Sequence, residues 1–143
     1  MPKLQPYFAY GSNLNTKQFK ARCPNSRYVG NAVLRNYEFI IASRGFATVI
    51  PCRGSLVEGC LCELTTADER TLDRCEGVKQ GCYRKEYLPV QVGSKTIRAL
   101  VYIDNDPALG SPEIGYVKKI LLGAADRELS MAYQKKLFKI LTA

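Results

Sequence analysis

The chain has 143 residues, enough for one domain with its own core, and its composition of 46% hydrophobic and 24% charged residues excludes a disordered or low-complexity protein. No apolar run is long enough for a membrane-spanning helix, and the first residues turn polar too early for a signal peptide. We therefore expect a cytoplasmic globular protein that makes no membrane contact.

The net charge of +8 favours anionic partners, either nucleic acid or small acidic substrates. The basic residues are scattered, with small clusters at Lys118-Lys119 and over residues 135–139 that are typical of the solvated face of a helix. No base-reading motif accompanies them, so we expect no nucleic-acid partner.

Histidine is absent, which excludes Ser-His-Asp and Cys-His nucleophile systems and histidine-ligated zinc. Proton transfer near neutral pH then requires a carboxylate, Tyr, Lys or Cys with a shifted pKa. The six cysteines are Cys23, Cys52, Cys60, Cys62, Cys75 and Cys82. They include no C-x-x-C pair, so we expect reduced structural thiols, no metal site and no cofactor.

The first predicted strand, residues 6–10, ends at Gly11-Ser12-Asn13. Asn15, with Gln18 three residues later, has the pattern of a helix N-cap, which predicts a short helix to about Arg22. The loop at residues 11–14 therefore joins a strand end to a helix start, where free backbone N–H groups can face an anion.

The next segment is predicted to form two pairs of strands, divided at Arg35-Asn36 and around Pro51 and Gly54. These strands are residues 27–34, 37–42, 47–50 and 55–64. Residues Thr66 to Glu69 then fit a capping box, and Gly77 has the position of a C′ residue, so this helix is expected to end at about Glu76.

The remaining chain predicts a hairpin of residues 83–92 and 95–103, joined by the two-residue turn Gly93-Ser94. A helix starting at Ser111-Pro112-Glu113, with the proline in the first position, is expected to be capped at Gly123, and a last helix begins at about Ser130. About seven strands and four short helices without regular alternation indicate a single α+β domain over residues 1–143, with a curved or barrel-like mixed sheet and short flanking helices.

Glu76 has an unusual position for a carboxylate, in the last turn of its helix. There it faces the negative end of the helix dipole, which costs about 0.3–1 kcal/mol and raises its pKa, as a general base near neutral pH requires. By itself the pattern also fits an ordinary exposed glutamate. Likewise, Tyr10-Gly11-Ser12-Asn13 alone fits a strand end followed by turn residues.

Two segments together resemble a known family. Residues Tyr7 to Leu14, YFAYGSNL, are similar to the opening signature of the γ-glutamylcyclotransferase family. Residues Leu72 to Val78, LDRCEGV, resemble its Leu-Asp-x-x-Glu-Gly segment, which holds the catalytic glutamate. The likeness continues at residues 79–83, 116–120, 123–124 and 133–137, in the same order as in the family.

The resemblance implies a small barrel-like domain that cyclises a γ-glutamyl amide, because the substrate's own α-amine attacks its γ-carbonyl and releases 5-oxoproline and a free amine. Glu76 matches the glutamate that moves the proton. The residues that the resemblance assigns to substrate binding are Tyr7, Tyr10, Gly11, Ser12, Asn13, Leu14, Tyr83 and Tyr116. For Tyr83 and Tyr116, an aromatic half-buried in the core is the alternative.

Three functions remain open at this point. The first is a γ-glutamylcyclotransferase acting on small anionic γ-glutamyl peptides. The second is removal of a γ-glutamyl group from a side-chain amine or a biosynthetic intermediate, and the third is a non-catalytic binding protein or basic interaction module. The resemblance is silent about the amine half of the substrate, and a monomer and a homodimer are both compatible with the sequence. Residues 42–55 are richer in arginine than the corresponding loop of the animal enzymes.

Overall fold

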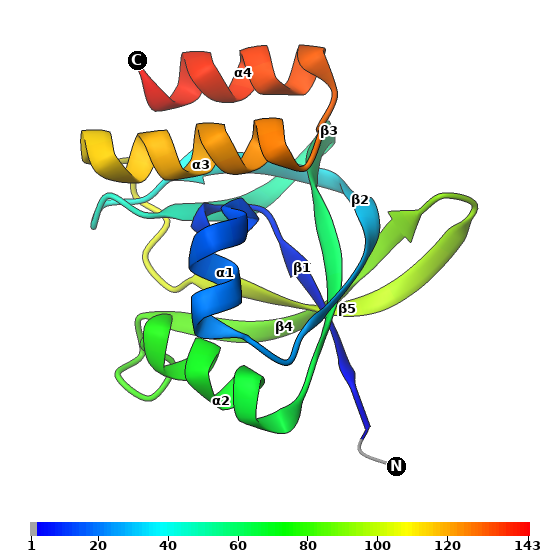
Figure 1. The fold of residues 1–143 in the computed structure, drawn as a ribbon. Helices are drawn as coiled ribbons and strands as arrows, with labels where there is room; N and C mark the ends of the chain where they lie inside the picture. The colour runs from blue at the N-terminus through cyan, green and yellow to red at the C-terminus, as the bar shows by residue number, and fades with distance from the viewer. Residues whose placement is uncertain (1–2) are drawn as a thin grey trace.

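Five strands close into a barrel in the computed structural model, which describes residues 3–143 (Figure 1). The strands are β1 (Gln5–Ala9), β2 (Arg27–Ile41), β3 (Ala47–Leu64), β4 (Tyr83–Val92) and β5 (Lys95–Asp104). Their order around the barrel is β1-β3-β2-β4-β5, and the barrel is closed by a parallel contact between β1 and β5. The predicted α+β fold with a mixed, barrel-like sheet is confirmed.

The helices are short and lie outside the barrel. They are the 3-10 turn η1 (Ser12–Leu14) and the α-helices α1 (Thr16–Arg22), α2 (Thr66–Cys75), α3 (Ile114–Asp126) and α4 (Met131–Leu141). In Figure 1, α3 and α4 lie along one another at the top of the molecule, and α1 lies between them and α2.

The four strands predicted between residues 27 and 64 are in fact two long ones, so that part of the prediction is wrong. β2 and β3 pair antiparallel over most of their length, with a register shift between Arg35 and Tyr37. Asn36 takes a left-handed conformation there (φ 65°), and Gly54 does the same within β3 (φ 87°). These residues bend a continuous strand at a bulge instead of ending it, because cross-strand pairing resumes on both sides.

The core fills the barrel and the space between the sheet and α1. In β1, Tyr7, Phe8 and Ala9 are all buried, because one face of the strand points into the barrel and the other is covered. Tyr7 stacks on Phe19 of α1, with 6.0 Å between ring centroids. A strand covered on both faces leads directly into the loop at residues 11–14, so this loop starts from a rigid base.

Two helix ends agree closely with the predictions. Asn15 caps α1, since its side chain accepts from the Gln18 N–H at 3.0 Å. α2 is capped by Thr65, one residue earlier than predicted, and ends with Glu76 as C-cap residue. Gly77 follows in the left-handed conformation (φ 62°) that the sequence pattern indicates.

α3 differs from its prediction at both ends. It begins at Ile114, two residues after Pro112, and continues past Gly123 to Asp126. Gly123 therefore does not cap the helix. It lies where α3 crosses the loop, and a Cβ atom there would be 2.5 Å from the backbone nitrogen of Asn15. This glycine allows close backbone contact between α3 and the loop, and Glu128 takes the left-handed conformation after the helix instead (φ 56°).

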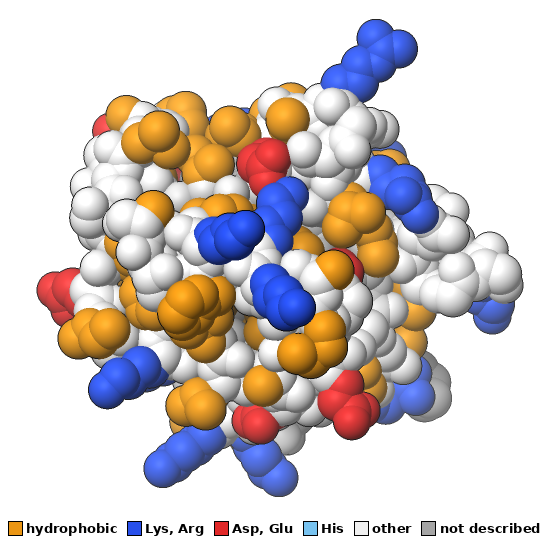
Figure 2. Space-filling view, turned by 90° about the horizontal axis from the view of Figure 1, so that it is seen from above, with side chains coloured by type: hydrophobic (Ala, Val, Ile, Leu, Met, Phe, Trp, Pro, Cys, Tyr) orange, Lys and Arg blue, Asp and Glu red, His pale blue; other side chains and the backbone are white. Residues whose placement is uncertain are grey.

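The face seen in Figure 2 shows lysines and arginines scattered among exposed hydrophobic side chains. The exposed hydrophobic residues of α3 and α4 include Leu122, Met131 and Phe138. No helix within residues 3–143 has the length and apolar character to span a membrane.

Candidate active site

A cavity of about 470 Å³ opens where β1 ends, between η1, the end of α2 and the loop that joins β2 to β3. Its volume is in the usual range for a small-molecule site. It is lined by Tyr7, Tyr10, Gly11, Ser12, Asn13, Gln18, Arg22, Arg44, Phe46, Ala47, Arg74, Cys75, Glu76, Gly77, Gln80, Cys82, Tyr83, Tyr102, Tyr116 and Lys119. The structure thus brings the predicted site residues together, with one exception. Leu14 does not line the cavity, because its side chain is fully buried in the core.

The loop at residues 11–14 forms the cavity floor as a single 3-10 turn. The Leu14 N–H donates to the Gly11 carbonyl at 3.0 Å, and the Asn15 N–H donates to the Ser12 carbonyl at 3.0 Å. The backbone N–H groups of Ser12 and Asn13 precede these bonds and have no acceptor within residues 3–143. They are the free donors that the strand–loop–helix pattern predicts.

Asn13 is 4% exposed and is held from three directions. Its Nδ2 donates to the Tyr7 hydroxyl at 3.0 Å, and its Oδ1 accepts from Gln18 Nε2 at 3.2 Å and from Arg22 Nη1 at 3.1 Å. Gln18 also donates to Ser12 Oγ at 2.9 Å. α1 therefore orders the loop through side chains as well as through its cap. The sequence analysis missed Arg22, and it used Gln18 only as a capping signal.

Glu76 lies at the C-terminal end of α2 and faces the cavity. Within residues 3–143 its carboxylate has neither a hydrogen-bond donor nor an ion-pair partner. Burial raises its pKa to about 7, although the positive charges of Arg22 and Arg44 oppose that rise. The predicted direction is confirmed, but the principal cause is loss of solvation rather than the helix dipole.

The tyrosines around Glu76 remain protonated at neutral pH. Burial raises the pKa values of Tyr7, Tyr10, Tyr83 and Tyr116, and the Glu76 charge raises each of them further. These phenols can donate hydrogen bonds but cannot act as bases near pH 7. Glu76 is therefore the carboxylate of the cavity that is poised to exchange a proton at that pH.

Two of these tyrosines hold the start of β3 by its backbone. The Tyr116 hydroxyl accepts from the Ala47 N–H at 2.8 Å, and the Tyr83 hydroxyl donates to the Ala47 carbonyl at 2.6 Å. The Tyr116 hydroxyl accepts in this bond, so it can still donate its own proton to another acceptor. The Tyr83 hydroxyl already donates its proton to the Ala47 carbonyl. Tyr10 also has a structural bond, from its hydroxyl to the Tyr102 carbonyl at 2.7 Å.

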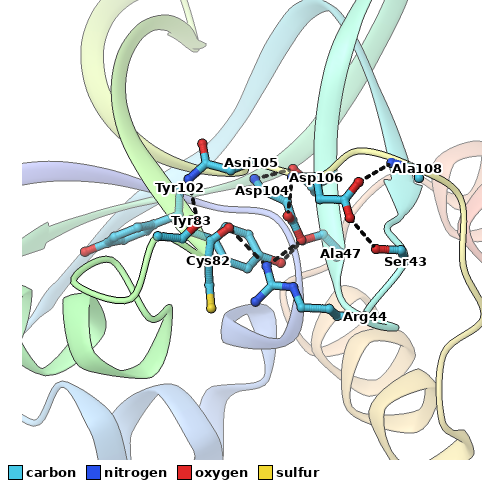
Figure 3. Close-up of polar contacts among 12 residues, drawn as sticks. Ser43, Arg44, Ala47, Cys82, Tyr83, Tyr102, Asp104, Asn105, Asp106 and Ala108 are labelled. Carbon is cyan, nitrogen blue, oxygen red and sulfur yellow. Dashed lines mark hydrogen bonds and ion pairs between the residues drawn. The ribbon is translucent and has the colours of Figure 1, made fainter.

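Arg44 enters the cavity from the β2–β3 loop, and the sequence analysis did not assign it to the site. Its Nη2 donates to Asp104 Oδ2 at 2.8 Å and to the Cys82 carbonyl at 3.0 Å, as Figure 3 shows. The guanidinium also lies over the Tyr83 ring, 5.4 Å from its centroid. Asp104 is only 2% exposed and anchors this arginine from β5. The single signal in the sequence was the arginine content of residues 42–55.

All six cysteines are free thiols. Cys23, Cys60 and Cys62 are buried in the core, as expected of structural thiols. Cys75 and Cys82 differ from that expectation because they line the cavity on either side of Gly77. Within residues 3–143, no group of three or more His, Cys, Asp and Glu side chains is arranged to hold a metal ion.

The structure defines a small closed-barrel protein with a tyrosine-lined pocket, in which burial raises the pKa of the Glu76 carboxyl group to about 7. Comparison with known proteins identifies its family. Residues 7–118 match the family described as gamma-glutamyl cyclotransferase, AIG2-like, and the chain belongs to this family.

The relatives agree in both sequence and fold. The chain is 30% identical to gamma-glutamylcyclotransferase of Bos taurus over 94% of its own length and 77% of the relative's. It is also 30% identical to the Homo sapiens protein of the same name, over 92% of the chain and 76% of the relative. A solved structure named gamma-glutamyl cyclotransferase is 29% identical, with a TM-score of 0.90 over 96% of this chain and 88% of that one.

Proposed function

We propose that this protein is a γ-glutamylcyclotransferase with Glu76 as its general acid–base group. The observation that carries the proposal is the Glu76 carboxylate, which faces the cavity without an internal partner and has a pKa of about 7. A carboxylate with that pKa can accept a proton and return it within one reaction cycle. The similarity to enzymes of this name supports the same activity.

In the proposed reaction the nucleophile belongs to the substrate. Glu76 takes a proton from the substrate's α-ammonium group, and the freed amine attacks the γ-carbonyl carbon. Attack leaves the ring nitrogen with one proton in excess, and this proton passes to water as the lactam forms. The C–N bond to the leaving amine breaks as Glu76 delivers its proton to that nitrogen, which yields 5-oxoproline and a free amine. The protein contributes positioning, one proton shuttle and stabilisation of the oxyanion.

The floor of the cavity suits the charge that develops in this reaction. The free N–H groups of Ser12 and Asn13 are the donors that we assign to the oxyanion or to the α-carboxylate of the glutamyl group. The Tyr116 hydroxyl proton is a further donor at the same site. Arg22, Gln18 and Tyr7, which hold this floor through Ser12 and Asn13, would preorganise it before the substrate arrives.

The activity is expected to fall below about pH 7, because only the ionised form of Glu76 accepts the proton. For one essential carboxylate, kcat/KM decreases about tenfold for each pH unit below its pKa. The measurement is a pH–rate profile from about pH 5.5 to 8 with a γ-glutamyl dipeptide whose amine does not titrate in that range. A profile that stays flat over this range would contradict the assigned base.

The direct test of the function is mass spectrometry of reactions with γ-glutamyl dipeptides, glutathione and γ-glutamyl-lysine isomers. Production of 5-oxoproline from the α-amino-acid dipeptides is the expected result. Product from a side-chain amide alone would favour removal of γ-glutamyl groups from side-chain amines. A complete lack of product with the whole panel would favour a specialised intermediate or a binding protein.

The proposal includes a cytoplasmic location and a small anionic γ-glutamyl substrate. Free thiols at all six cysteines support a reducing compartment.

A further inference from the structure

The helix that carries Glu76 is held against the barrel mainly by polar contacts. Among the described residues of α2, Leu72 is the one fully buried apolar side chain, since Cys75 at the last position is exposed. Near the start of the helix, the Asp68 carboxylate accepts from the Asn25 N–H at 3.0 Å. Apolar contact is not directional, so a single leucine does not determine how the last turn is oriented. The direction of the Glu76 side chain therefore depends on the polar contacts of that turn.

Four residues anchor the last turns of α2 to the hairpin of β4 and β5. The Tyr102 hydroxyl donates to Asp73 Oδ1 at 2.7 Å, and Lys85 Nζ donates to the same carboxylate at 3.1 Å. Lys85 also pairs with Glu69, one turn earlier in the helix. Lys85 and Tyr102 are opposite one another in the register of β4 and β5, so both side chains project from the same face of the sheet. We call Tyr102, Lys85, Asp73 and Glu69 the α2 anchor.

Tyr102 is the rigid member of this anchor. It is only 2% exposed, and its ring packs edge-on against Tyr7, with 5.8 Å between the ring centroids. Burial and the hydrogen bond to Asp73 raise the pKa of Tyr102, so its hydroxyl keeps the proton and remains a donor. Lys85, in contrast, reaches the helix through a long flexible side chain. The Tyr102 hydroxyl is therefore the fixed point of the barrel against which the end of α2 is placed.

The hydrogen bonds at the end of α2 connect this anchor to Glu76. The Glu76 N–H donates to the Leu72 carbonyl at 2.8 Å, and the Val78 N–H donates to the Asp73 carbonyl at 3.0 Å. Asp73 and Glu76 therefore belong to the same closed turn, which Gly77 ends in the left-handed conformation. A movement of Asp73 carries Glu76 with it, and a displacement of about 1 Å in an active site can cost about 100-fold in rate.

We propose that Tyr102 is a positioning residue for the reaction: its hydrogen bond to Asp73 holds the end of α2 where the Glu76 carboxylate faces the cavity. This inference rests on the proposed function for the role of Glu76. Tyr102 takes no part in proton transfer, because its hydroxyl proton is donated to Asp73. Its contribution is therefore expected in kcat, which depends on the geometry of proton transfer, and not in substrate binding.

Tyr102→Phe tests this role, since it removes the hydroxyl and keeps the packing of the ring. Because Lys85 still holds Asp73, kcat is expected to fall about tenfold. In a Glu76→Gln background, the same change is expected to leave the Kd of a γ-glutamyl dipeptide, from calorimetry, unchanged. Tyr87→Phe in β4 is the matched control, because Tyr87 is 39% exposed and lies outside both the anchor and the cavity lining. It is expected to retain wild-type kcat.

Two substitutions of Asp73 separate its hydrogen bond from its charge. Asp73→Asn keeps an oxygen that can accept from Tyr102, so kcat is expected to stay within about threefold of wild type. Asp73→Ala removes the acceptor and is expected to lower kcat at least tenfold. Adding Tyr102→Phe to Asp73→Ala is expected to lower kcat no further, because both changes break the same bond. Losses that multiply in the double variant would contradict the proposal.

The titration of Glu76 is a second measurement, and it needs no turnover. Arg22 of α1, Arg44 of the β2–β3 loop and Asp104 of β5 are the charged groups that act on its carboxylate, and Tyr102→Phe leaves all three in place. If Glu76 loses its fixed position, water reaches the carboxylate. Its pKa, followed by carbon NMR of the side-chain carboxyl group, is then expected to fall from about 7 toward its ordinary value of 4.5.

The two measurements distinguish failure of this inference from failure of the proposed function. An unchanged Glu76 pKa in Tyr102→Phe, or a wild-type kcat, would overturn the positioning role of Tyr102. Wild-type protein that releases no 5-oxoproline would instead contradict the proposed function, and the NMR comparison would still decide whether Tyr102 positions Glu76.

Discussion

Glu76→Gln is expected to lower kcat by about 100- to 10,000-fold while the protein remains folded and still binds substrate. The variant keeps the shape of the side chain and removes its ability to accept a proton. Because the carboxylate has no hydrogen-bond donor or ion-pair partner within residues 3–143, no structural interaction is lost with it. Turnover is measured as 5-oxoproline release, and binding is measured separately by calorimetry.

Glu113→Gln is the matched control, since Glu113 is exposed at the start of α3 and its side chain makes no capping hydrogen bond. It is expected to retain wild-type turnover. Near-normal activity of Glu76→Gln would instead show that another group moves the proton.

Glu76→Gln is also expected to change how the free energy of unfolding depends on pH. The folded-state pKa of Glu76, about 7, is above its ordinary value of 4.5, so the folded protein binds more protons between these values than the unfolded chain does. The Glu76 contribution to stability therefore falls as pH rises through this window, and Glu76→Gln removes that loss. At about pH 8 the variant is expected to be more stable than wild type by about 1–2 kcal/mol, and the difference should vanish near pH 4.5. Urea denaturation at the two pH values measures it.

Gly123→Ala is expected to lower both stability and activity. Alanine inside a helix is normally better than glycine by about 0.5–1 kcal/mol. Here the added Cβ would lie 2.5 Å from backbone atoms of Leu14 and Asn15, which cannot yield as a flexible side chain can. α3 must then move away from the loop, at a cost of about 1–3 kcal/mol, and kcat/KM is expected to fall at least tenfold because the cavity floor is displaced.

Gly115→Ala in the same helix is the control for this prediction. No atom lies within 4 Å of a Cβ placed there, so this variant is expected to be as stable as wild type or slightly more so, with unchanged activity. Unfolding free energies of both variants from urea titrations, together with their kcat/KM values, check the pair. If Gly123→Ala were as stable and active as Gly115→Ala, the contact between α3 and the loop would not be the tight one described here.

Features formed by neighbouring residues were predictable from the chain alone. Asn15 caps α1, Gly77 ends α2 in a left-handed conformation, and Gly93 lies in the turn between β4 and β5 with φ 59°. Each depends on backbone conformation within a few residues, so no distant contact is needed to specify it. The resemblance to a known family assigned Glu76 and the loop at residues 11–14 to the site, because each of them lies within a short sequence motif of that family.

Other features depend on parts of the chain that meet only in the folded protein. Asn36 and Gly54 look like strand ends, yet β2 and β3 continue through them because pairing across the barrel outweighs the local preference. Gly123 looks like a cap, and its role is set by the backbone of Asn15, which packs against it. Local propensity contains no information on such contacts.

The chemistry of the site is decided in the same way. Arg44 and Asp104 are 60 residues apart and meet only because the β2–β3 loop packs against β5. The helix position of Glu76 gave the right direction for its pKa, but the main cause is burial by every element around the cavity. Loss of solvation depends on the atoms that surround a carboxylate in space, and residues adjacent in the chain are only a small part of these.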